Sequence, residues 1–211
     1  ALADKREVGE FKVGSVDVAD VERYTANGAS NLVRDSRDPV VLDTLFRAAI
    51  LKDTTGDTIA TLSHFGNHPE AMADENVMIT SDFADPLRRG LETGVVYDSY
   101  TREGYGGVSI YINGAVGGLM TPLGITVVDG EGSVFPPDYT FERNEAMGKV
   151  MAEHAMDALD EAEAVTDMSL TGITNQFMLP VDNFGFQGMF LANIIKREVF
   201  DYDSTQIIDE V

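Results

Sequence analysis

The chain has 211 residues, enough for one large hydrophobic core, and its 44% hydrophobic and 24% charged residues are typical of a globular protein. The 36 Asp and Glu residues outnumber the 15 Lys and Arg residues, giving a formal net charge of −21 that argues against nucleic acid and anionic lipid as partners. Cysteine is absent, which excludes disulfides, thiolate metal ligands and a cysteine nucleophile, so any metal must bind through nitrogen or oxygen.

The first elements follow from turn signals and apolar runs. Residues 1 to about 40 are rich in turn formers, with Asp38-Pro39 closing the segment, and we expect an irregular surface region there. Two β-prone runs, Leu45–Leu51 and Thr58–Phe65, flank a polar, glycine-containing turn at 52–57. This pattern predicts a β-hairpin.

A helix and a further strand follow. Thr80-Ser81-Asp82 offers an N-cap for a helix running to about Glu92. The next predicted strand is Gly107–Asn113, followed by a glycine-rich turn and by loops over about 119 to 140. The uncharged stretch Gly107–Val128 is interrupted by glycines, Asn113 and a proline, so we expect no transmembrane segment.

The last third contains the strongest helical signal. Apolar residues recur every three or four positions over Phe141–Val165, with Glu153, Asp157 and other acids assigned to the opposite face. A final strand is predicted at Leu170–Val181 and a loop at 183–187. Strands alternating with helices predict an α/β class with a mixed β-sheet flanked by helices and long loops at the strand ends.

A histidine-bearing segment at the end of a predicted strand is the first candidate site. His64 and His68 are two of only three histidines in the chain, and loops that leave strand ends are where α/β folds place their sites. Neutral imidazole is a common zinc ligand. The spacing of four residues alone favours structural histidines, because this segment lacks a helical pattern that would place both rings on one face.

The surrounding motifs carry a family resemblance. They are Asn67-His68-Pro69-Glu70, Ile79-Thr80-Ser81-Asp82-Phe83, Leu87-Arg88-Arg89-Gly90-Leu91-Glu92 and Gly114-Ala115-Val116-Gly117-Gly118. Their order resembles the N-terminal domain of neutral/alkaline ceramidases over roughly residues 35 to 125. The resemblance implies that residues 1–211 are a single ceramidase-like α/β domain segment, with the boundaries of the full domain outside the chain.

The resemblance also implies a chemistry. In that family the histidine corresponding to His68 binds a catalytic zinc, which points to a zinc-dependent amide hydrolase acting on an N-acyl lipid or related small molecule. The family's other zinc ligands lie in motifs that this chain does not show: there is no His-x-His before His64 and no Pro-Gly-Glu near the end. We therefore expect them on further segments of the same protein or on an assembly partner.

The nucleophile position departs from the family pattern. Family members place a serine in a Gly-Asp-Val-Ser-Pro-like turn, whereas this chain has Met120 or Thr121 there, depending on a one-residue gap. Methionine cannot attack a carbonyl, so Thr121 is the candidate, provided that a base lies nearby. Glu70 and Asp82 are candidates to hydrogen-bond the metal ligand or to act as a general base, with a helix cap as the plainer role for Asp82. His64 is a candidate to contact the metal or the substrate, and its strand position equally suits a hydrogen-bonded buried polar group.

Two function classes remain. The first is the zinc hydrolase, and the second is a non-catalytic extracellular structural or binding protein on the same fold, favoured by Met120 and by the missing ligand motifs. The family resemblance implies an extracellular or periplasmic location for either.

Overall fold

The computed structural model describes residues 7–19, 25–26, 29–30, 32–36, 40–117, 120–167, 169, 171–174 and 182–196. The chain divides into two compact units, Ala1–Asp167 and Met168–Val211. In the second unit, α3 (Phe184–Leu191) begins where Asn183 accepts hydrogen bonds from the amides of Gly185 and Phe186. The loop expected at 183–187 is therefore wrong, because a side-chain cap starts a helix there.

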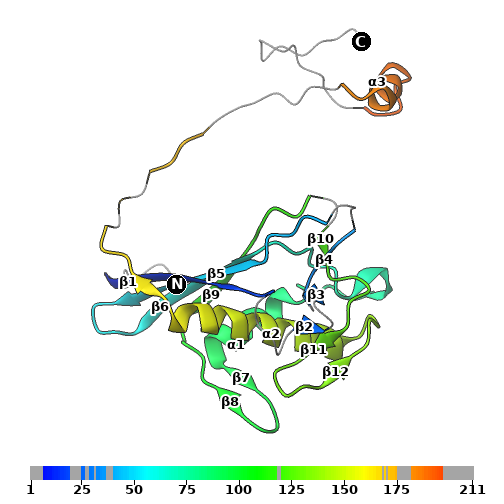
Figure 1. The fold of residues 1–211 in the computed structure, drawn as a ribbon. Coiled ribbons are helices and arrows are strands. Elements are labelled where there is room, and N and C mark those ends of the chain that lie inside the picture. The colour runs from blue at the N-terminus through cyan, green and yellow to red at the C-terminus, as the bar shows by residue number, and fades with distance from the viewer. Residues whose placement is uncertain are drawn as a thin grey trace. The chain divides into compact units, whose positions relative to one another are not determined.

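A five-stranded mixed sheet forms the centre of the first unit (Figure 1). Its order is β13 (Glu163–Ala164), β1 (Val8–Asp17), β5 (Leu45–Asp53), β6 (Thr58–Phe65) and β9 (Val108–Asn113). Only the β6/β9 pair is parallel. The predicted α/β class and mixed sheet are confirmed, as are the hairpin and the strand at 108–113.

Strand β1 corrects the expectation of an irregular region over residues 1–40. It pairs antiparallel with β5 over nearly its whole length. Gly14 obscured the strand pattern, but the fold requires it: a Cβ atom at this position would lie 1.9 Å from the carbonyl oxygen of Ala158. Glycine thus lets the helix that contains Ala158 approach the strand backbone closely.

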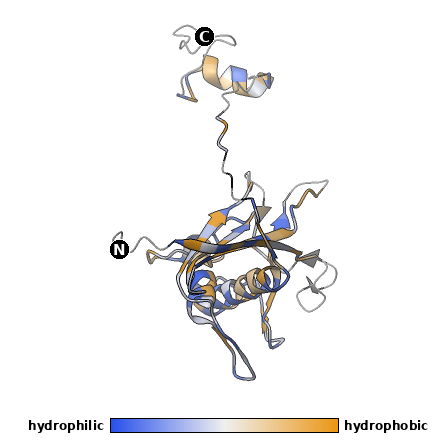
Figure 2. Ribbon diagram, turned by 90° about the vertical axis from the view of Figure 1, so that its left-hand side faces the viewer, coloured by the Kyte–Doolittle hydropathy of each residue, from blue (hydrophilic) through white to orange (hydrophobic). Residues whose placement is uncertain are grey.

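Two helices, α1 (Ala84–Thr93) and α2 (Phe141–Asp160), lie on the same side of this sheet (Figures 1 and 2). Thr140 caps α2 by accepting from the amide of Arg143, and the helix ends at Asp160 rather than at the predicted Val165. The helices and the sheet enclose one core, whose largest apolar members are Phe46, Phe65, Phe83, Leu87, Leu91, Met147 and Met151.

The connection from β6 to β9, which contains α1, determines where the loops that follow these two strands meet. Because β6 and β9 are parallel, the segments that follow Phe65 and Asn113 leave the sheet at the same edge. The amide of Gly114 donates to the carbonyl of Phe65 at 2.9 Å, which joins the two segments where they begin. This edge carries the loop with His68.

Shorter elements complete the description. They are β2 (Thr25–Ala26), β3 (Ala29–Ser30), β4 (Arg34–Asp35), a 3-10 turn (Ala73–Glu75), β7 (Val95–Val96), β8 (Thr101–Arg102), β10 (Met120–Thr121), β11 (Val127–Val128) and β12 (Val134–Phe135). The strand predicted at 170–181 is not formed at 171–174, and residues 170 and 175–181 lie outside the described residues. No helix in the described part of the chain is long and apolar enough to cross a membrane.

Candidate functional site

The loop after β6 is fixed by a buried asparagine. Asn67 is fully buried; its Nδ2 donates to the carbonyl of Leu32 at 2.8 Å, and its amide donates to Oδ1 of Asn113 at 3.2 Å. The amide of the next residue, His68, donates to the carbonyl of Met120 at 3.3 Å. The histidine loop is therefore held between the 32–35 segment and the segment after β9.

The ring of His68 has a defined orientation. Its Nε2 lies 3.2 Å from the carbonyl oxygen of Gly117, and the side chain is half-buried. A carbonyl oxygen only accepts, so Nε2 carries the proton and Nδ1 of the neutral ring carries the free lone pair. Metal-bound histidines are commonly oriented by this kind of hydrogen bond to a backbone carbonyl.

The described residues provide only part of a zinc site. Within the described residues there is no group of three or more His, Asp or Glu side chains placed to hold a metal ion. A catalytic zinc takes about three protein ligands, whereas His68 is one. The described residues of this chain thus orient one ligand and do not form a zinc site by themselves.

Next to His68, a hydroxyl and a carboxylate meet. Thr121 Oγ1 donates to Glu70 Oε1 at 2.5 Å and accepts from the amide of Leu123 at 3.1 Å. Thr121 is 8% exposed and Glu70 is half-buried. Sequence spacing does not reveal this pair, because 51 residues separate its members. A carboxylate therefore lies within hydrogen-bond distance of the Thr121 hydroxyl.

Met120 has a different role from its neighbour. Its side chain is 5% exposed and belongs to the hydrophobic core, beside Gly66. Residues 120 and 121 form β10, which pairs with β4. Strand alternation sends successive side chains to opposite faces, so Met120 anchors this segment in the core while Thr121 meets Glu70. Gly118 and Leu119, in the preceding turn, lie outside the described residues.

Asp82 holds the backbone of the histidine loop rather than capping α1. The N-cap of α1 is Phe83, without a side-chain cap bond. Asp82 adopts a φ of 55°, and its carboxylate accepts from the amides of Ala71 and Met72, each at 3.0 Å, and of Phe83 at 2.8 Å. The helix-cap expectation is wrong, because these buried amides need an acceptor.

His64 lies on the other face of the sheet from the helices. Its register partners are Arg47 on β5 and Ile112 on β9, whereas the buried β6 residues on either side, Ser63 and Phe65, face the helices. Its Nδ1 is buried and makes no hydrogen bond among the described residues. Within the described residues, the His64 side chain makes no hydrogen bond to His68, Glu70 or Thr121.

Arg143 ties the two site loops together, and sequence analysis missed it. The side chain is 1% exposed, and its guanidinium donates to the carbonyls of Ala71 (3.0 Å), Pro122 (2.6 Å) and Ile125 (3.0 and 3.3 Å). Burial lowers the pKa of Arg143. Its partners are backbone atoms far away in sequence, which leave no motif.

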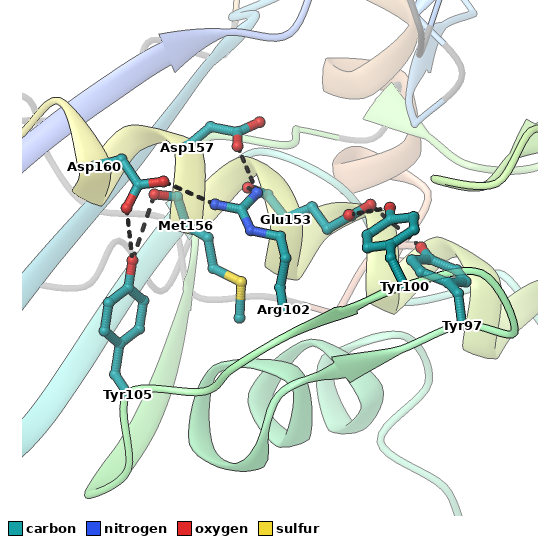
Figure 3. A network of polar contacts seen from close by, with 8 residues as sticks. All are labelled: Tyr97, Tyr100, Arg102, Tyr105, Glu153, Met156, Asp157 and Asp160. Atoms are coloured by element: carbon teal, nitrogen blue, oxygen red, sulfur yellow. Dashed lines mark hydrogen bonds and ion pairs between the residues drawn. The ribbon is translucent and has the colours of Figure 1, made fainter.

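A second polar cluster joins the β7–β8 hairpin to α2 (Figure 3). Glu153 is fully buried and accepts from the hydroxyls of Tyr97 at 3.2 Å and Tyr100 at 2.6 Å. Arg102 pairs with Asp157 and Asp160 on the same helix. Placing Glu153 on a solvent face was wrong, since these phenols satisfy its carboxylate inside the protein.

An open groove is lined in part by Asp82, the residue that holds the backbone of the histidine loop. Its volume is about 630 Å³, and it runs between the first turns of α1 and α2, lined by residues that include Ile79, Asp85, Arg89, Phe141 and Glu145. Neither His68, Glu70 nor Thr121 lines it. The groove therefore does not identify the Thr121 and Glu70 pair as a substrate pocket.

Comparison with known proteins shows a likeness of fold. No protein-family model matches the chain, and no curated protein matches it in sequence. The chain is similar to the structure of neutral ceramidase from Pseudomonas aeruginosa, with a TM-score of 0.53 and 16% identity, covering 72% of this chain and 22% of that chain. A ceramidase complexed with C2 is similar at a TM-score of 0.50 and 15% identity, with the same coverage. The ceramidase-like fold expected from the sequence is confirmed, and the chain spans about a fifth of the length of these proteins.

Proposed function

We propose that the chain is part of a zinc-dependent hydrolase that cleaves the amide bond of an N-acyl lipid or a related small molecule. The ceramidase-like fold and the orientation of the His68 ring support His68 as one zinc ligand. When bound, zinc supplies Lewis-acid polarisation of a carbonyl and acidifies a bound water. The remaining ligands are proposed to come from other segments of the same protein or from an assembly partner.

Thr121 is the proposed nucleophile and Glu70 its general base. As Thr121 Oγ1 bonds to the amide carbon, its proton passes to the Glu70 carboxylate, which returns it to the leaving nitrogen as the C–N bond breaks. Water then attacks the threonyl ester while Glu70 accepts its proton, and Glu70 returns that proton to Thr121 Oγ1 as the ester C–O bond breaks and the free acid leaves. The amide of Leu123 orients Oγ1. The hydrogen bond between Thr121 and Glu70 is the observation that carries this proposal.

The test is a set of variants in the polypeptide expressed from the complete reading frame that encodes these residues. With an N-acyl lipid substrate we expect Thr121→Val and Glu70→Gln each to lower kcat by roughly 10²–10⁴-fold with little change in KM, and Thr121→Ser to retain activity. Thr101→Val, at an exposed strand position, is the matched control and should not change kcat. Full activity in Thr121→Val would refute the nucleophile.

Zinc itself needs a separate measurement. Elemental analysis of the same polypeptide should find stoichiometric zinc, and His68→Ala should lose most of it. The control is the melting temperature of His68→Ala, which we expect near the parent value because the ring makes one described hydrogen bond, to Gly117. Absence of zinc from the parent protein would contradict the metal proposal while leaving the Thr121 test intact.

A non-catalytic binding protein on the same fold is the second candidate. The lack of a three-member metal group among the described residues and the 8% exposure of Thr121 favour it. For a non-catalytic protein we expect no bound zinc and no turnover of N-acyl substrates. We also expect Glu70→Gln to have the same stability as the parent protein. For either function the ceramidase resemblance supports an extracellular or periplasmic location, which protease accessibility on intact cells tests.

A further inference from the structure

Within the described residues of the first unit, one face of the central sheet carries apolar side chains that no helix of that unit covers. The register places Val13 beside Ala49, Ala49 beside Leu62, and Leu62 beside Ile110. Alternate residues on β5 and β6, such as Ile50 and Phe65, are buried beneath the helices on the opposite face. We call the uncovered set the open face; its members are Phe11, Val13, Ala49, Leu51, Ala60, Leu62, Val108, Ile110 and Ile112.

Four of these side chains are exposed, and the other five are partly buried. The exposed fraction is 44% for Val13, 56% for Val108, 47% for Ile110 and 45% for Ile112. An antiparallel sheet that faces water normally carries polar residues on its outer face, and a continuous apolar patch of several hundred Å² typically marks an interaction site. Apart from Arg47 and His64 at one end, the open face has the chemistry of a buried one.

The net charge of this chain and the length of the similar ceramidase chains favour one kind of partner for the open face. A formal charge of −21 opposes an anionic lipid surface, and it opposes a second copy of equal charge. The similar ceramidase chains carry about four-fifths of their length outside the matched segment. We propose that an apolar layer of secondary structure, supplied by the remainder of a longer polypeptide, covers the open face.

The absence of cysteine in these residues provides the test. Ile110→Cys is placed in the isolated 211-residue chain and in the polypeptide expressed from the complete reading frame. Reaction with a maleimide, followed peptide by peptide with mass spectrometry, should be at least tenfold slower in the longer polypeptide. Val134→Cys, at an exposed strand position outside the open face, is the matched control and should react equally in both.

Equal labelling of Ile110→Cys in both polypeptides would overturn the proposal, as would a reading frame that encodes no further domain. Two other occupants have their own outcomes. Labelling of the isolated chain that slows as protein concentration rises would assign the open face to a second copy. Protection by phosphatidylcholine vesicles would assign it to a lipid surface, and either result overturns the proposal. Ile110→Ser, examined by circular dichroism, checks that substitution at this position leaves the chain folded.

Discussion

Replacing Arg143 with methionine should destabilise the protein far more than removing a surface arginine that forms two ion pairs. The buried guanidinium makes four hydrogen bonds to three backbone carbonyls. Methionine has a similar reach but donates nothing, so those carbonyls lose their buried donors. Each buried acceptor left unsatisfied costs about 1–3 kcal/mol, and release of the guanidinium from its desolvated position offsets part of the sum. We therefore expect a loss of about 3–5 kcal/mol.

Urea denaturation followed by circular dichroism measures this loss, and Arg89→Met is the control. Arg89 pairs with Asp85 at 2.8 Å and with Glu145 at 2.6 Å, but its side chain is 51% exposed. Exposed ion pairs contribute about 0–1 kcal/mol. Arg143→Lys should fall between the two variants, because lysine keeps the charge without the planar fork. If Arg143→Met and Arg89→Met differed by less than about 1 kcal/mol, the role assigned to the buried guanidinium would be refuted.

Three further outcomes follow from the structure. Gly14→Ala should lower the unfolding free energy by about 1–3 kcal/mol, because its Cβ would meet the backbone of Ala158; unchanged stability in urea would contradict this close approach. Tyr100→Phe should cost about 1–3 kcal/mol by removing a donor to the buried carboxylate of Glu153, and a neutral result by thermal melting would count against that network. Burial, aided by Asp160, raises the pKa of Tyr105 from 10.0 to about 12, so its stabilising contribution should be complete below pH 10 and lost as the pH rises towards 12. In an ultraviolet titration, Tyr105→Phe should show one fewer phenol ionising near pH 12 than the parent protein.

Local patterns predicted the existence of the hairpin built from β5 and β6, of strand β9 and of most of α2, which have alternating or helical apolar spacing. The burial of β9 runs opposite to its pattern, since Ser109 is buried while Ile110 and Ile112 are exposed. Strand β1 escaped prediction because Gly14, which weakens the strand pattern, is demanded by a helix more than 140 residues away. Helix α3 escaped because glycine and phenylalanine alternate where a cap at Asn183 starts the helix.

The candidate site divides in the same way. His68 was singled out because it follows a strand in a motif that resembles the ceramidases, so its signal is local. Thr121 was identified by position, yet its pairing with Glu70 depends on a parallel strand crossover that brings two loops together. Asp82 and Arg143 satisfy backbone groups, and backbone partners leave no trace in side-chain spacing.

The way the loops are held makes the zinc measurement interpretable. Asn67, Asp82 and Arg143 hold the backbone around His68 through buried hydrogen bonds, none of which uses the imidazole ring. The loop geometry should therefore persist in His68→Ala. Loss of zinc from a His68→Ala variant with parental stability would then report a missing ligand rather than a collapsed loop. If His68→Ala instead lost as much stability as Arg143→Met, the imidazole ring would be part of the structural support of the loop. The argument for His68 as a zinc ligand would then fail.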